Sequence, residues 1–190
     1  MRRTRPIGCL AILLLTLFGC RVTPDAKENA ADAKTNGPVT AEERTAIAYL
    51  DAITRRDWED MAAFLGEGSV YRDVTMAHFD SPAIDLRGVE PIVEFWRKSY
   101  EDTDARVENR ILTRFTAGSW VILVLRPDIS IDGAYWDVPG ERIEGRFDQI
   151  TILRIEGGKV RHHTDHVDYA EAMQHVEAAR TAARGQETRG

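Results

Sequence analysis

The apolar periodicity of the chain changes once, near Asp104, and this change restricts the fold more than any other feature of the sequence. Before that point, apolar residues recur at helical spacing, as at Ile47, Leu50 and Ile53. After it, they run in extended segments that are separated by short glycine-containing turns. Helices followed by strands are typical of an α+β domain with a largely antiparallel sheet.

Three helices are predicted before the change of period. The first begins at a capping box formed by Thr40 and Glu43, the second is capped by Asp57, and the third follows the break at Gly88. Six strands and one further helix complete the prediction. The expected strands are residues 69–73, 84–87, 106–115, 120–131, 143–155 and 159–166, and the expected last helix is 169–183.

The first twenty residues are predicted to be a targeting segment. Three arginines precede an apolar run over residues 7–18, which is the layout of a signal peptide and is shorter than the roughly 20 residues of a membrane span. The run ends in Leu17-Phe18-Gly19-Cys20, which resembles the lipobox of bacterial lipoproteins, where the cysteine is lipidated. An ordinary secretory signal with a chance cysteine is the alternative.

Four segments follow from these patterns. Residues 1–19 are expected to be a lipoprotein signal peptide, and residues 20–39 to be the lipidated Cys20 and a flexible tether, because this stretch is too polar to bury a core. Residues 40–183 are the folded domain, and 184–190 a disordered tail. Lipidation would hold the chain on the membrane of the bacterial cell envelope. In a bacterium with two membranes we expect the outer membrane, facing the periplasm.

The composition limits the classes of partner. Acidic residues outnumber basic ones, 31 to 25, for a formal net charge of −6, so nucleic acid is not expected as a partner. The only two cysteines, Cys9 and Cys20, lie in the first twenty residues. The folded part therefore has neither a disulfide framework nor a cysteine metal site.

Short motifs are spread over residues 40–180 in a distinctive order. They are Arg56-Asp57-Trp58, Tyr71-Arg72-Asp73, Arg87-Gly88, Phe95-Trp96, Gly157-Gly158-Lys159-Val160 and Asp165-His166-Val167-Asp168. Together they resemble the nuclear transport factor 2-like superfamily, and most closely its SnoaL-like branch. The resemblance implies a cone: a curved mixed or antiparallel sheet wrapped around about three helices, with a pocket at the wide end. It also implies frequent homodimers through the convex sheet face, which the apolar run 121–125 would suit.

Two positions in the first half resemble the catalytic groups of ketosteroid isomerase within this superfamily. Asp73 resembles the proton-shuttling base, and Tyr49 the tyrosine of the oxyanion hole. A carboxylate in an apolar pocket can move protons near neutral pH, and a phenol can donate to a developing enolate. The third group of that enzyme falls near Thr151, a weaker donor. The alternative is that Asp73 caps a turn and Tyr49 is a packing residue.

The last predicted strand has the densest group of polar residues. Alternation places His162, Thr164 and His166 on one face, and His163 with Asp165 on the other. Asp165 resembles the acidic residue near the end of the last strand in SnoaL-like cyclases and limonene-type epoxide hydrolases. We therefore expect His163 and Asp165 to face the pocket, where they would form an acid/base pair.

Other patterns give weaker signals. Arg126-Pro127-Asp128 and Arg146-Phe147-Asp148 have the letters of an epoxide hydrolase Arg-x-Asp pair but not its position. No metal or other cofactor is expected, since His162 and His166 lie about 13 Å apart on a strand and lack a further ligand. Aromatic side chains are expected to line the pocket. The candidates are Trp58, Tyr71, Trp96, Trp120 and Trp136.

Two functions stay open on the sequence. One is a membrane-tethered module that binds a small apolar molecule or acts as an accessory or assembly protein. The other is a cofactor-independent acid/base enzyme of the isomerase, cyclase or dehydratase type, using Asp73 or the pair His163 and Asp165. The superfamily includes both catalytic and non-catalytic members, so fold alone does not decide between them.

Overall fold

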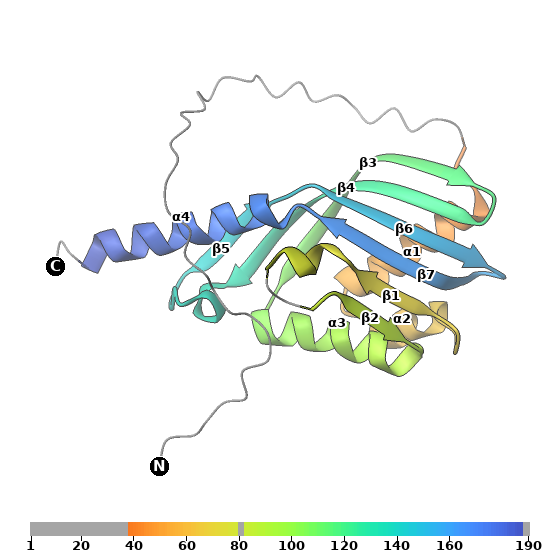
Figure 1. Ribbon diagram of the computed structural model, residues 1–190, viewed down its shortest axis with the longest axis horizontal. Helices are drawn as coiled ribbons and strands as arrows, with labels where there is room; N and C mark the ends of the chain where they lie inside the picture. The colour runs from red at the N-terminus through yellow and green to blue at the C-terminus, as the bar shows by residue number, and fades with distance from the viewer. Residues whose placement is uncertain (1–37, 80–81, 188–190) are drawn as a thin grey trace, which may run out of the picture.

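The computed structural model describes residues 38–79 and 82–187, and within them one curved sheet is covered on one side by helices (Figure 1). The predicted signal peptide, Cys20 and residues 20–37 of the predicted tether lie outside the described residues. No helix of the described part combines the length and the apolar character needed to cross a membrane.

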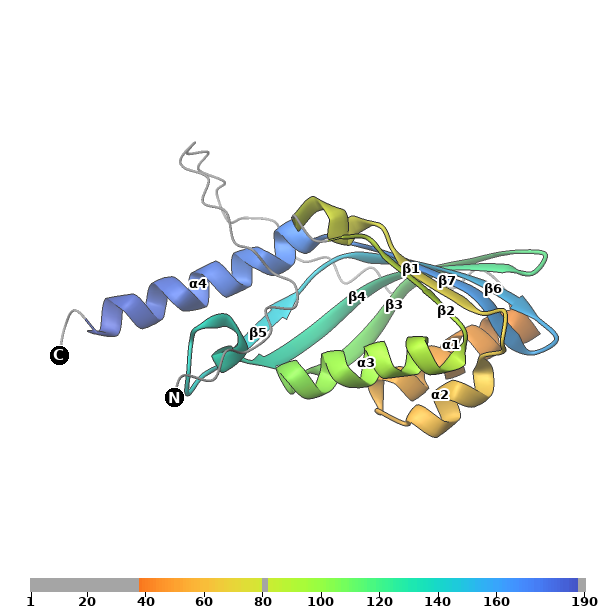
Figure 2. The same cartoon turned by 60° about the horizontal axis from the view of Figure 1, so that its bottom comes forward.

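Three helices pack against the concave side of the sheet (Figure 2). Thr40 caps the first through the predicted capping box: its hydroxyl accepts from the Glu43 N–H, and the Glu43 carboxylate accepts from the Thr40 N–H. Asp57 caps the second, and Gly88, with φ of 88°, precedes the third. These helices are α1 (Ala41–Thr54), α2 (Trp58–Phe64) and α3 (Val89–Thr103).

The seven strands form one sheet with the order β2-β1-β7-β6-β4-β3, and β5 pairs with β4 beside this path. All pairs are antiparallel except β1 with β7, which is parallel. Glycines with positive φ sit in the tight β3–β4 and β6–β7 turns, as predicted. The strands are β1 (Val70–Asp73), β2 (Ile84–Arg87), β3 (Arg106–Ala117), β4 (Trp120–Asp132), β5 (Arg142–Arg146), β6 (Gln149–Glu156) and β7 (Lys159–Val167).

The prediction of a single strand over residues 143–155 is wrong, because the chain forms two strands, β5 and β6, with a break between them. At the break, the backbone bonds to the start of the last helix instead of to β4. The Asp148 N–H donates to the Glu171 carboxylate, and its carbonyl accepts from the Asp168 N–H. Phe147 lies at this break, between β5 and β6, and its side chain lines the interior cavity described below.

The last helix, α4 (Tyr169–Glu187), continues beyond Ala183, where we predicted its end. Its first half packs on β5, and Figure 1 shows its second half extending away from the sheet. The contact depends on Gly145, since a Cβ there would lie 3.0 Å from the His175 ring. His175 Nε2 in turn lies within hydrogen-bond distance of the Arg146 backbone.

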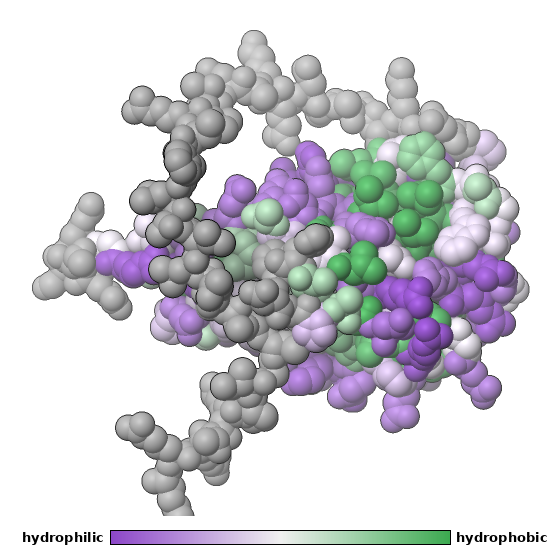
Figure 3. All heavy atoms as spheres, in the orientation of Figure 1, coloured by the Kyte–Doolittle hydropathy of each residue, from purple (hydrophilic) through white to green (hydrophobic). Residues whose placement is uncertain are grey.

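The two faces of the sheet differ in burial. Val121, Leu123 and Leu125 of β4 are fully buried against the helices. Within the run 121–125, therefore, only Ile122 and Val124 face outward, which corrects the expectation that the whole run could form an interface. Figure 3 shows apolar side chains gathered over the outer face near β3 and β4. The exposed ones there include Phe115 and Trp120.

Candidate functional site

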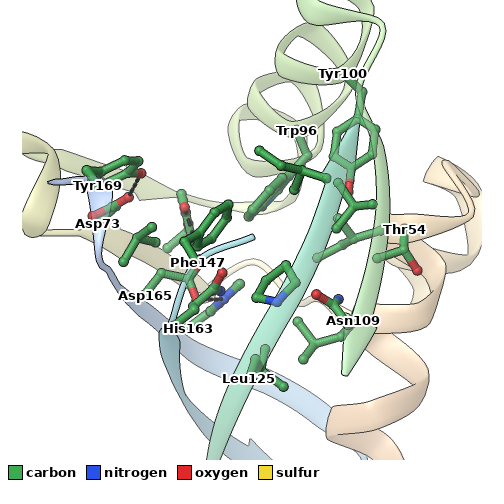
Figure 4. A pocket seen from close by; sticks show the side chains of 18 residues that line it. Thr54, Asp73, Trp96, Tyr100, Asn109, Leu125, Phe147, His163, Asp165 and Tyr169 are labelled. Atoms are coloured by element: carbon green, nitrogen blue, oxygen red, sulfur yellow. Dashed lines mark hydrogen bonds and ion pairs between the residues drawn. The ribbon is translucent and has the colours of Figure 1, made fainter. Parts of the chain in front are cut away.

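A cavity of about 170 Å³ lies between the concave side of the sheet and the helices α1 and α3 (Figure 4). Its walls are mainly aliphatic and aromatic, and five aromatic side chains contribute to them. A cavity of roughly 150 Å³ holds a benzene ring, so this one is large enough for a small aromatic molecule. The aromatic residues are Tyr71, Trp96, Tyr100, Phe147 and Tyr169.

The polar side of the cavity comes from the parallel pairing of β1 and β7. The register sets Tyr71 beside His163 and Asp73 beside Asp165. Because side chains two residues apart on a strand share a face, all four point into the cavity wall. The prediction that His163 and Asp165 face inward is therefore confirmed, and both are at most 2% exposed.

Asp165 is held by neutral donors and by one histidine. Its Oδ1 accepts hydrogen bonds from Thr151 Oγ1 at 2.6 Å and Gln149 Nε2 at 2.9 Å. From the described residues its Oδ2 accepts one hydrogen bond, a long one of 3.3 Å from the Tyr71 hydroxyl. Burial alone would raise the pKa of Asp165, but the neighbouring His163 and these hydrogen bonds hold it below its usual value. Asp165 is consequently ionised at neutral pH, with one weakly bonded oxygen beside the cavity.

His163 lies between Asp165 and Tyr49. Its Nε2 is 3.1 Å from Asp165 Oδ1, an ion-pair distance, although the N–H is not aligned for a hydrogen bond. Its Nδ1 is 3.2 Å from the Tyr49 hydroxyl. A carboxylate next to Nε2 favours a proton on that nitrogen, which leaves Nδ1 to accept from Tyr49. The Trp96 ring lies nearly parallel to the imidazole, with 6.1 Å between the two ring centroids.

Tyr49 reaches the site only through His163. It is completely buried and is absent from the described residues that line the cavity. Burial, together with the charge of Asp165, raises the pKa of Tyr49 far above its usual value, so its hydroxyl keeps its proton. Tyr49 is therefore a residue that positions the His163 imidazole.

Asp73 lines the cavity and also caps a turn, which combines both of the predicted alternatives. Its Oδ1 accepts from the N–H and hydroxyl of Thr75 and from the Met76 N–H, at the start of the turn η1 (Thr75–Phe79). Its Oδ2 accepts from the Tyr169 hydroxyl at 2.5 Å. Asp73 is thus more firmly held than Asp165.

Of the five aromatic residues predicted to line the pocket, Tyr71 and Trp96 do so and three do not. Trp58 begins α2 and packs edge-on against Tyr100 at 5.7 Å. Trp120 lies on the outer face because the pleat of β4 alternates, and it is 40% exposed. Trp136 lies in the turn η2 (Gly133–Trp136), where the Arg180 side chain donates to its carbonyl.

The two Arg-x-Asp triplets pair with each other instead of with the cavity. Arg126 forms two hydrogen bonds to Asp148, and Arg146 bonds to Asp128. Only the middle residues, Pro127 and Phe147, line the cavity. The residues that β6 directs to Asp165 are the neutral Gln149 and Thr151, so the arrangement lacks an arginine at the carboxylate.

Sequence reasoning did not single out three polar residues of the site. Gln149 and Tyr169 each bond to a buried carboxylate, and Asn109 of β3 lines the opposite wall. Gln149 could have been found from strand alternation, since it lies two residues before Thr151 on β6. Tyr169 gave no signal, because its role depends on where α4 begins.

No group of three histidine, cysteine or acidic side chains within residues 38–79 and 82–187 has the geometry of a metal site. His162 lies on the outer face, where its Nε2 is 2.6 Å from the Thr164 hydroxyl.

The family model described as SnoaL-like domain matches residues 46–163, which include α1 from Ala46 onward, the sheet up to His163, and most of the cavity wall. No curated protein matches the sequence.

Solved structures share the fold. A candidate SnoaL-like polyketide cyclase from Shewanella putrefaciens aligns with a TM-score of 0.67 and 22% identity, covering 86% of this chain and 99% of that one. An epoxide hydrolase of the LEH-like type from M. tuberculosis aligns with a TM-score of 0.59 and 17% identity, covering 76% of this chain and 95% of that one. At these identities the likeness establishes the cone fold, in agreement with the predicted α+β class.

Proposed function

The chain belongs to the SnoaL-like domain family, and from this premise we propose that its cavity is the site of a cofactor-independent proton transfer on a small, largely apolar molecule. The reaction would be of the isomerase, cyclase or dehydratase type. Solved relatives of the fold include a candidate polyketide cyclase and an epoxide hydrolase, so small-molecule chemistry in this cone has parallels.

One observation carries the proposal: Asp165 is a buried carboxylate with one weakly bonded oxygen next to an apolar cavity, and His163 and its hydrogen bonds hold its pKa below the usual value. Its Oδ1 is held by three neighbours, while Oδ2 has only the long bond from Tyr71. A base must be ionised and within reach of the proton that it removes. Oδ2 is the oxygen that could accept that proton, because His163, which Tyr49 positions, lies on the Oδ1 side of the carboxylate.

The reaction step that fits this geometry is removal of a proton from a carbon next to a carbonyl group. The C–H bond breaks, the proton forms an O–H bond with Asp165 Oδ2, and the electron pair moves to the carbonyl oxygen. The Tyr71 hydroxyl, freed from its long bond to Oδ2, would donate to that oxygen as its negative charge develops. Return of the proton to a different atom completes an isomerisation.

Deuterium exchange tests the proposal without knowledge of the natural substrate. The full chain in mild detergent is incubated with β-tetralone, a small bicyclic ketone, in deuterium oxide, and exchange at its acidic carbon is followed by proton NMR. We expect exchange above the buffer rate, and a loss of about hundredfold or more in Asp165→Asn, since a positioned base contributes at least this much. Asp85→Asn, which removes a carboxylate from the outer face of β2, is the matched control.

Equal exchange rates in Asp165→Asn and Asp85→Asn would contradict the assignment of Asp165 as the base. Absence of exchange in the unaltered protein, together with tight binding of the ketone, would favour the second candidate instead.

The second candidate is a binding or accessory module. The observation that favours it is that neutral donors fill Oδ1 of both Asp73 and Asp165, which stabilises the cavity wall as it stands. Such a module would bind β-tetralone with saturable quenching of tryptophan fluorescence and leave its protons unexchanged.

We also propose that the chain is a lipoprotein of the bacterial cell envelope, anchored through a lipidated Cys20. The support is the sequence Leu17-Phe18-Gly19-Cys20 after a basic start and a short apolar run. Cys20→Ser should abolish labelling of the protein with palmitate and its recovery in the membrane fraction. Labelling that survives this change would show that the segment is not a lipoprotein signal.

A further inference from the structure

The cavity wall carries two buried carboxylates, and among the described residues that line it His163 is the one basic side chain. Asp73 and Asp165 are paired across β1 and β7, and neither is more than 2% exposed. None of the described residues that line the cavity is a lysine or an arginine. His163 can carry no more than one positive charge, so it can balance at most one of the two carboxylates.

The hydrogen bonds to these carboxylates follow one pattern. In each carboxylate, Oδ1 accepts at least two hydrogen bonds from neutral neighbouring groups. Among the described residues, Oδ2 accepts one hydrogen bond, from a tyrosine hydroxyl. Tyr71 is the donor to Asp165, and Tyr169 the donor to Asp73. A carboxylate oxygen has more than one lone pair, so each Oδ2 retains the capacity to accept a further donor.

The negative field extends to the tyrosines around the carboxylates. Burial raises the pKa of Tyr71 well above its usual value, and the charges of Asp165 and Asp73 add to this effect. Burial and the Asp73 charge likewise raise the pKa of Tyr169. An anion entering the cavity would meet the same repulsion.

The aromatic walls add a second attraction for positive charge. Ring faces carry negative quadrupole density and attract ammonium groups within about 6 Å, most strongly when water is excluded. The aromatic residues that line the cavity are Tyr71, Trp96, Tyr100, Phe147 and Tyr169. Figure 4 shows Trp96 and Tyr100 on one side of the cavity, with Asp73, Tyr169 and Asp165 on the other.

We propose that the ligand of this cavity is a hydrophobic organic amine, whose protonated nitrogen lies beside Asp73 and Asp165 and whose apolar body packs on the aromatic wall. The inference rests on the proposed function only in taking this cavity as the ligand site. It does not require that Asp165 transfers a proton.

Three ligands of nearly the same shape test the charge preference on the unaltered protein. Phenethylamine is a cation at neutral pH, phenethyl alcohol is neutral, and phenylacetate is an anion. Binding to the full chain in mild detergent is measured by calorimetry. We expect the amine to bind at least tenfold more tightly than the alcohol, a difference of about 1.4 kcal/mol, and phenylacetate to bind more weakly than either. An alcohol that binds as tightly as the amine would overturn the proposal.

Variants separate the cavity from the general acidity of the chain. Asp73→Asn keeps an oxygen that can cap η1, so the turn should persist. We expect this change to remove most of the preference for amine over alcohol, whereas Asp85→Asn on the outer face should leave it unchanged. A preference that survives in Asp73→Asn and in Asp165→Asn would come from surface charge and would overturn the proposal.

The outcome is independent of the exchange experiment. Amine preference without deuterium exchange would mean that the cavity binds amines and that the proposed proton transfer fails. Exchange without amine preference would leave the proton transfer standing and overturn the amine proposal.

Discussion

Replacing Tyr49 by phenylalanine tests whether this residue acts through His163. The change removes one hydroxyl from a side chain that is completely buried. His163 Nδ1 would lose its partner at 3.2 Å while remaining buried. A buried polar atom left without a partner costs about 1–3 kcal/mol. For a domain of this size we expect a decrease in Tm of roughly 2–4 °C for each kcal/mol.

The assay is thermal and urea unfolding followed by circular dichroism, with Tyr135→Phe as the control, because Tyr135 is 46% exposed. Tyr49→Phe should also lower the β-tetralone exchange rate less than Asp165→Asn does, since it loosens the imidazole but leaves the base in place. Our reasoning would be refuted by a Tyr49→Phe protein that matches the Tyr135→Phe control in both stability and exchange.

Three further predictions concern the rest of the fold. Glu43→Gln should lower the free energy of unfolding by about 3–5 kcal/mol at neutral pH in urea titrations, because it removes the carboxylate that forms a buried ion pair with Arg114 at 3.0 Å. Burial would raise the pKa of Glu43, but its hydrogen bonds and Arg114 lower it below its usual value. The ion pair therefore stabilises the protein fully above the unfolded pKa of about 4.3. As the pH falls through the lower pKa of the folded state, the difference in stability between variant and parent should shrink. Gly145→Ala should lower the free energy of unfolding by about 1–3 kcal/mol, since the new methyl group crowds the His175 ring at 3.0 Å; an unchanged Tm would argue against this packing. The homodimer expected from the resemblance stays a prediction; if the outer sheet face forms it, Phe115→Glu should give monomers in sedimentation velocity, and a parent protein that already sediments as a monomer would contradict it.

Local signals in the sequence predicted most of the elements, because the interactions that end them are local. The Thr40 capping box, the Asp57 cap and the Gly157-Gly158 turn each involve groups within a few residues of one another. Side-chain alternation also predicted that His163 and Asp165 share one face of β7. The choice of which face points inward came from the resemblance, and the structure agrees with it.

The errors arose where distant segments decide the structure. The break at Asp148 depends on hydrogen bonds to Glu171 and Asp168, which no local pattern reveals. The aromatic candidates were chosen by residue type, whereas strand pleat and helix packing decide their direction. These effects turned Trp120 outward and set Trp58 against Tyr100.

The donors around Asp165 could not be predicted from the sequence for the same reason. Gln149 and Thr151 lie on β6, and Tyr71 lies on β1, so the carboxylate draws its partners from both neighbouring strands. Sequence analysis identified Asp165 and His163 but not the neutral groups that donate to the carboxylate.

The central claim is that the cavity beside His163 and Asp165 binds a small molecule. Native mass spectrometry of the full chain, purified in mild detergent from its own host, tests this most directly. We predict a retained small molecule, and its loss in Val107→Trp, which fills the cavity from β3. An unoccupied protein, with β-tetralone and phenethylamine binding equally well to the parent and to Val107→Trp, would contradict the claim.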